Sequence, residues 1–372
     1  MGATDFRVLL HQFLSAFIKE AAERPVECYL ASCRKPSILS HSFQRASVLN
    51  RLQEGGVVFA IRPRRQEDQP TNNEVSDFVF RTPISQAGRF KGFCKLHDTA
   101  VFKPIETAPM SRNVYKYILL NAYRGFAYAH TSEKLLHDQT RGLQDTKYFK
   151  NTIRDHPRIA PFAKTQYESA VRDIQTRAAL AYPLERWDLV QERFEEIIDS
   201  SDPDYSETRV AKSFCVEYLP IPIDLYWAAL AGADLVLPGR GSTSSHPVCV
   251  GLLPQCDSWK PLFFFVCLQE EAKLHEDLLE KLRWQKRQPQ PDATVYLLLQ
   301  DLLLFLSGDI VMAPKLHRWL AQQGMSELLK QYWEDVTVPL GKGNPPARRL
   351  GEWRGFCLFP PLPPHGSLTR SR

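Results

Sequence analysis

Four soft metal ligands in two close pairs constrain the fold of this chain more than any other feature of its sequence. The first pair is Cys28 and Cys33, and the second pair, much further along the chain, is Cys94 and His97. Zn²⁺ is held by four thiolate or imidazole ligands in a tetrahedron, and each short pair supplies two of them. The spacing therefore predicts a structural Zn²⁺ site that joins two distant segments.

The other cysteines do not indicate a disulfide scaffold. Eight cysteines in 372 residues are too sparse for one, and a reducing cytosol keeps such residues as thiols. We expect those outside the two pairs to be small buried side chains; they are Cys215, Cys249, Cys256, Cys267 and Cys357.

No segment of the chain suits a membrane. The apolar runs stay below the roughly 18 residues that a transmembrane helix needs, and the first residues carry no charged-then-apolar leader. With 44% hydrophobic residues, the chain can bury a large core. We expect a soluble, cytoplasmic protein without a membrane partner.

The net charge of +5 is located at one end of the chain. Residues 339–372 hold six cationic residues against Glu352, so the rest of the sequence is neutral. Any contact of the body with DNA or RNA must therefore rest on local patches rather than a global field. The clearest patch is Arg62, Arg64 and Arg65, and it is the predicted phosphate-binding segment.

Hydrophobic periodicity predicts a mixed α+β protein. Helices are expected over residues 6–22, 43–53, 98–105, 113–137, 162–200, 270–285 and 295–306, the last with a strand as an alternative at its start. Strands are expected over 57–61, 78–80, 214–219, 248–253 and 262–267. The predicted units are a zinc-binding module over 1–110, a helical hairpin over 111–205, an α+β domain over 206–338 and a Pro-rich basic tail over 339–372.

The order of elements around the two ligand pairs is typical of a treble-clef zinc module. A cysteine knuckle comes first, a strand pair follows, and a helix begins where Cys94 and His97 stand. The pieces therefore occur in the order that a treble clef requires, with its helix supplying the second ligand pair.

Three residues close to the ligand pairs are candidates for chemistry. His41 follows the first pair. Its candidate roles are a general base, a helix cap, a hydrogen-bond partner of a zinc thiolate, and the fourth ligand in place of His97. Asp98 suits a helix cap, a partner of the zinc ligands or a ligand of a hard cation. Arg124 is a candidate for binding a phosphate group or for forming an ion pair with Glu106.

The strings over residues 92–98, 102–106 and 122–124 resemble those of an uncharacterised bacterial family. Its members combine paired cysteines, a Ser-His and a Cys-x-x-His-Asp motif, and the resemblance extends to about residue 145. The order of motifs is also distantly similar to the HNH class of treble-clef nucleases. That similarity implies structural Zn²⁺ on the four ligands, His41 as the general base, Mg²⁺ or Mn²⁺ near Asp98, and a role in bacterial defence.

Two positions depart from the HNH pattern. Ser40 stands where that class has an acidic or histidine residue, and Asp98 stands where it has asparagine. The functional expectation is a metal-dependent nuclease or a degenerate relative that acts on nucleic acid. The alternative is a non-catalytic zinc-stabilised module that binds nucleic acid or protein, with the 206–338 region recognising a protein partner.

Overall fold

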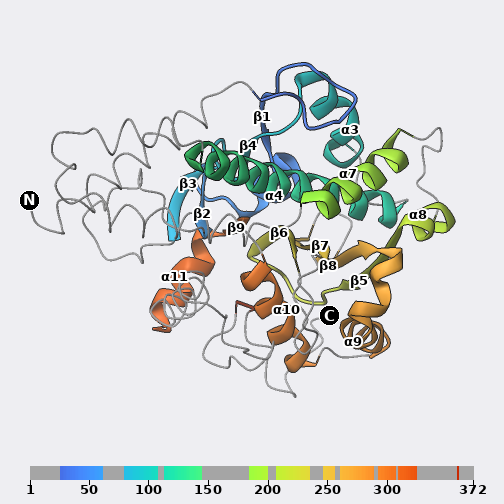
Figure 1. Ribbon diagram of the computed structural model, residues 1–372. Coiled ribbons are helices and arrows are strands. Elements are labelled where there is room, and N and C mark those ends of the chain that lie inside the picture. Colours follow the sequence, from blue (N-terminus) through green and yellow to red (C-terminus); the bar gives the residue numbers. More distant parts are fainter. Residues whose placement is uncertain are drawn as a thin grey trace, which may run out of the picture.

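The computed structural model describes residues 26–61, 79–107, 113–144, 184–199, 207–234, 246–255, 260–288, 292–306, 309–324 and 358–359 (Figure 1). Some sequence-based predictions lie outside these residues: the helix over 6–22, the cluster Arg62, Arg64 and Arg65, most of the helix over 162–200, and nearly all of the tail over 339–372. The described part is a mixed helix and sheet structure, as the sequence analysis expected.

A seven-stranded sheet forms the centre of the molecule, with the strands in the order β3-β2-β9-β6-β7-β8-β5. All neighbouring strands run antiparallel. The strands are β2 (Val57–Ile61), β3 (Val79–Pro83), β5 (Phe214–Pro220), β6 (Trp227–Asp234), β7 (Pro247–Leu253), β8 (Leu262–Leu268) and β9 (Asp309–Met312).

The neighbouring strands β7 and β8 are buried along their whole length. Alternate residues of a strand point to opposite faces of a sheet, so Phe264 and Val266 enter one hydrophobic core and Phe263 and Phe265 enter the other. Because both faces are covered, the sequence of these strands is apolar throughout instead of alternating with polar residues.

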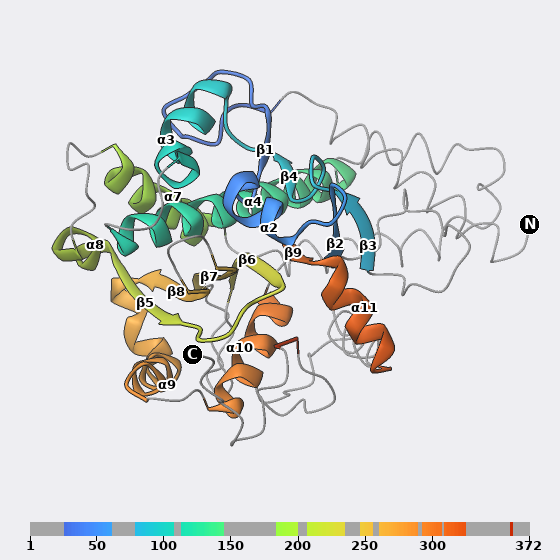
Figure 2. The same ribbon diagram turned by 180° about the vertical axis from the view of Figure 1, so that it is seen from behind.

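Helices cover the sheet on both sides (Figures 1 and 2). One side carries α4 (Val114–Gln144) and α7 (Leu184–Ile198), with α8 (Glu207–Ser213) leading into β5. The other side carries α9 (Glu276–Lys286), α10 (Ala293–Leu306) and α11 (Pro314–Gln322), with the 3-10 helix η4 (Gln269–His275) between β8 and α9. The segment over 295–306 is therefore helical, and the strand alternative for it is wrong.

Two glycines allow α4 to lie close against β6. A Cβ atom on Gly232 would stand 3.0 Å from the Cα atom of Phe126, and one on Gly125 would stand 3.1 Å from the Cβ atom of Leu230. Protein interiors have few voids to absorb such atoms, so the helix and the strand meet through glycine on each side.

The ligand pairs lie in a segment that sits beside α4 and α7 (Figure 2). It contains β1 (Leu39–His41), η1 (Arg45–Leu49), α2 (Asn50–Leu52), β4 (Arg89–Lys91) and α3 (Lys95–Thr107). β1 and β4 form a separate two-stranded antiparallel sheet. β4 leads within a few residues into α3, which begins at Lys95 rather than at Asp98.

The division expected at residue 110 is not a boundary of the sheet. β2 and β3 come from the segment assigned to the zinc-binding module, yet β2 pairs with β9 from the far end of the chain. A strand pair with an apolar face needs a larger sheet to be stable, and β9 supplies it. None of the described helices combines the length and the apolar character required to cross a membrane.

Candidate metal centre

The first ligand pair is shaped by a short turn of backbone. The N–H of Cys28 donates to the carbonyl oxygen of Lys35 at 2.8 Å, and the N–H of Cys33 donates to that of Leu30 at 2.9 Å. These two hydrogen bonds fold the chain back on itself between the cysteines. Both sulfur atoms therefore lie in the same small group of ligand atoms.

The second ligand pair stands at the start of α3. Cys94 precedes the helix and His97 lies in its first turn, so the spacing of three residues places both on one side of the helix. Burial by itself raises the pKa of Cys94, but the backbone N–H groups of His97 and Leu96 and the neighbouring thiols hold it below its usual value. The helix start thus favours the thiolate that a metal requires.

Burial has the opposite result at the first cysteine. It raises the pKa of Cys28 to about 11, although the N–H of Cys94 donates to its sulfur at 3.2 Å. A thiol with this pKa keeps its proton at neutral pH until a metal ion displaces it.

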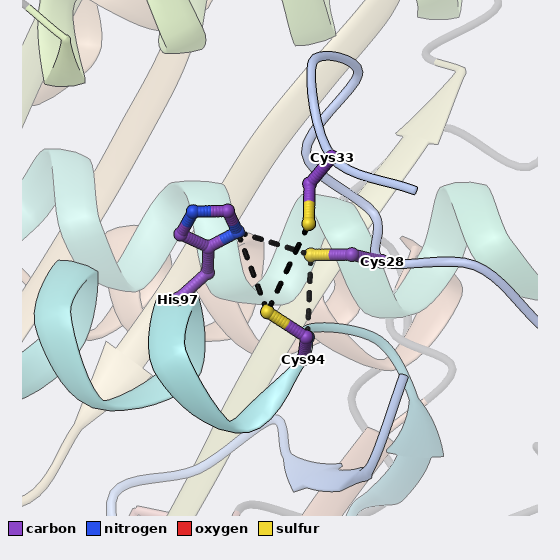
Figure 3. Close-up of side chains that lie close together, drawn as sticks. All are labelled: Cys28, Cys33, Cys94 and His97. Atoms are coloured by element: carbon purple, nitrogen blue, oxygen red, sulfur yellow. Dashed lines mark hydrogen bonds between the residues drawn. The ribbon is translucent and has the colours of Figure 1, made fainter. Parts of the chain in front are cut away.

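The four ligand atoms form a compact cluster, shown in Figure 3. All of them lie within 4.8 Å of one another. The Nδ1 atom of His97 is 3.4 Å from the sulfur of Cys28 and 3.5 Å from that of Cys94, and the sulfurs of Cys33 and Cys94 are 3.9 Å apart.

These separations fit one tetrahedral ion at the centre of the cluster. Zn–S bonds of about 2.3 Å and Zn–N bonds of about 2.0 Å place two sulfurs about 3.8 Å apart, and sulfur and nitrogen about 3.5 Å apart. Three thiols and one imidazole suit zinc, and four protein ligands leave no open position for a substrate. Within the described parts of the chain, no other group of three or more such side chains gathers its ligand atoms in this way.

Helix α7 holds the knuckle, the turn between Cys28 and Cys33, through side chains that are not metal ligands. The Ala31 N–H, between the two cysteines, donates to both carboxylate oxygens of Glu195 at 3.2 and 3.1 Å. Nε2 of Gln191 donates to the carbonyl of Tyr29 at 2.6 Å. The Tyr29 hydroxyl is hydrogen-bonded to Nδ1 of His130 at 2.7 Å. No local motif marks these partners, because they come from α4 and α7, more than a hundred residues further along the chain.

Glu195→Gln tests this support. We expect zinc to be lost to a chelator about tenfold faster, because the carboxylate that receives the Ala31 N–H becomes a neutral amide and a charge-assisted hydrogen bond contributes about 1.5–3 kcal/mol. The measurement is the release rate with a colorimetric chelator. Glu192→Gln, an exposed position on the same helix, is the control. Equal rates for both variants would contradict the role assigned to Glu195.

His41 lies near the cluster without belonging to it. It ends β1 opposite Arg89 of β4, and His97 is the histidine whose nitrogen reaches the sulfur atoms. The cluster therefore includes His97 and not His41. The preceding residue, Ser40, is buried, and its hydroxyl accepts the N–H of Phe93 at 3.3 Å.

The imidazole of His41 is half-buried and sits among positive charges. Burial lowers its pKa, and the charges of Arg124, Arg89 and Arg45 lower it further, against a backbone hydrogen bond at Ser85 that raises it. Its Nε2 atom is buried and has no hydrogen-bond partner in the described structure. The ring is therefore neutral at pH 7 and has a free nitrogen.

Arg124 and Asp98 lie next to each other. Nη2 of Arg124 is 2.9 Å from a carboxylate oxygen of Glu106 and 3.6 Å from one of Asp98. The guanidinium also stacks over the ring of Phe102, 4.3 Å from its centre. The predicted ion pair of Arg124 with Glu106 is thus present, and Asp98 is not a member of the ligand cluster.

Comparisons with protein-family models, with curated proteins and with solved structures found no match for this chain. The resemblance to the bacterial family and to HNH nucleases therefore stays a prediction from the sequence motifs.

Proposed function

We propose that this chain is a zinc-stabilised module of treble-clef type, a degenerate relative of HNH nucleases, that binds nucleic acid at the face around His41. The order of elements supports this proposal. The knuckle with the first ligand pair precedes β1, β1 pairs with β4, and β4 leads into α3 with the second pair. His41 at the end of β1 then occupies the position of the HNH base.

The observation that carries the proposal is the group of positive charges around His41. Arg89 lies directly opposite it, and Arg45 begins the next element of the chain; both side chains are exposed. Phosphate groups attract such clusters even where the rest of a protein is neutral. Arg62, Arg64 and Arg65 follow β2 in the sequence but lie outside the described residues, and their contact with phosphate stays a prediction.

Binding to a short fluorescent DNA or RNA strand tests the proposal. We expect the double variant Arg45→Gln/Arg89→Gln to bind about tenfold or more weakly. The slope of log affinity against log salt should fall by about 1.4–1.8, since each lost phosphate contact removes about 0.7–0.9. Fluorescence polarisation over a salt series measures both quantities. Arg287→Gln, exposed on the opposite side of the sheet, should bind as the unchanged protein does. Failure of the unchanged protein to bind either strand would refute the proposal.

A second candidate function is cleavage of the bound strand with His41 as the general base. The observation in its favour is the neutral ring with an unpartnered Nε2, since a base must be unprotonated and free to accept a proton. The test is incubation with plasmid DNA or RNA in Mg²⁺ or Mn²⁺. Equal cleavage by the unchanged protein and by His41→Ala would rule out His41. Recognition of a protein partner by the 206–338 region stays a prediction.

A further inference from the structure

The similarity to HNH nucleases implies a hard divalent cation beside His41, and the side chains there can be tested for their fit to one. Mg²⁺ and Mn²⁺ prefer several oxygen ligands, among them carboxylates. Asp98 and Glu106 are carboxylates of α3; Nη2 of Arg124 is 2.9 Å from an oxygen of Glu106 and 3.6 Å from Oδ1 of Asp98, which has no hydrogen-bond partner among the described residues. The hydroxyl of Ser40 is buried and accepts the N–H of Phe93.

Arg124 is fixed where it stands. Its side chain is 2% exposed, it belongs to α4 at the centre of the molecule, and it lies over the Phe102 ring. A guanidinium stays protonated at every relevant pH. A divalent cation on Asp98 or Glu106 would therefore meet a positive charge that can neither move away nor be neutralised.

Two nitrogen atoms of the guanidinium remain unused. Nε and Nη1 of Arg124 are buried and have no hydrogen-bond partner among the described residues. A buried donor without a partner is costly to stability, so this arrangement is not explained by the ion pairs alone. An oxygen atom of a ligand or of a water molecule would satisfy these donors.

We propose that Arg124 takes the place of the divalent cation, and that nucleic acid binds the His41 face without Mg²⁺ or Mn²⁺. The positive charge beside Asp98 is then a permanent part of the protein instead of an exchangeable ion. The nucleic-acid part of this inference rests on the proposed function, whereas the absence of a cation site does not.

Titration of the zinc-loaded protein with Mn²⁺, followed by electron paramagnetic resonance, tests the cation site directly. We expect the unchanged protein and Asp98→Asn to bind Mn²⁺ equally weakly. Arg124→Leu, which leaves two carboxylates without their counter-charge, should bind it at least about tenfold more tightly. A site in the unchanged protein that Asp98→Asn weakens by about tenfold would overturn the proposal. This comparison needs no folded Arg124→Leu protein.

Polarisation measurements with the same oligonucleotide separate this inference from the proposed function. In buffer freed of metal by a chelating resin, with zinc-loaded protein, we expect the same affinity as in buffer with added Mg²⁺. Binding that appears only with Mg²⁺ would support the proposed function and overturn the role of Arg124. If the oligonucleotide does not bind in either buffer, the proposed function fails, and the Mn²⁺ titration still decides whether a cation site exists.

Discussion

Replacing Cys94 by serine should release the zinc and unfold the segment that holds the two ligand pairs. A serine hydroxyl is a poor zinc ligand, and the three remaining ligands cannot close the tetrahedron. Binding of structural zinc contributes about 10–16 kcal/mol to the folding of small zinc modules, so the loss should exceed that of any single core substitution. Elemental analysis for zinc and thermal unfolding followed by circular dichroism measure the two results.

Cys215→Ser is the matched control for this experiment. Cys215 is a half-buried thiol of β5 outside the metal cluster, so its replacement should leave one zinc per chain. The free energy of unfolding is expected to fall by no more than about 3 kcal/mol, as for most single substitutions. A Cys94→Ser protein that retains one zinc and its melting temperature would contradict the ligand set.

The ligand cluster could be predicted from the sequence because each pair lies within one short turn or one helix turn. Cys28 and Cys33 are joined by local hydrogen bonds, and Cys94 and His97 by helical spacing. The strands with unbroken apolar runs, such as Val57–Ile61, could be predicted for the same reason. In each case the signal and the structure lie in the same few residues.

Two strands of the sheet could not be recognised in this way. β6 reads Trp-Ala-Ala-Leu-Ala-Gly-Ala-Asp and is rich in small residues of low strand propensity. Gly232 allows the close approach of α4, whereas Ala229 and Ala231 face the core on the other side of the sheet. β9 has only four residues, too few for an alternating pattern to stand out. Tertiary packing decides the structure in both places.

The surroundings of the candidate site also depend on distant residues. The contact of Glu195 with the knuckle joins two residues 164 positions apart, and no spacing rule connects them. Arg124 was associated with Glu106 as one alternative, but its second contact, with Asp98, changes the chemistry expected of that carboxylate. Whether Asp98 is free to bind a cation is therefore a property of the folded chain.

Phe126→Ala should have the second largest effect, and it tests whether the metal centre and the sheet fold together. Phe126 is fully buried on α4, stacks on Trp187 of α7 with ring centres 5.1 Å apart, and lies against Gly232 of β6. Loss of a buried phenylalanine side chain lowers the free energy of unfolding by about 3–5 kcal/mol. Denaturant unfolding measures this change.

The same substitution should accelerate zinc release, although Phe126 is not one of the four ligands. α7 carries both Trp187 and the carboxylate of Glu195 that holds the knuckle, so loosening α7 loosens the metal centre. The control is Leu96→Ala, because Leu96 lies next to the ligands but is 57% exposed; a change within about 0.5 kcal/mol is expected there. If the Phe126→Ala protein unfolds at a lower denaturant concentration but, below that concentration, releases zinc at the rate of the unchanged protein, the metal centre and the sheet are independent.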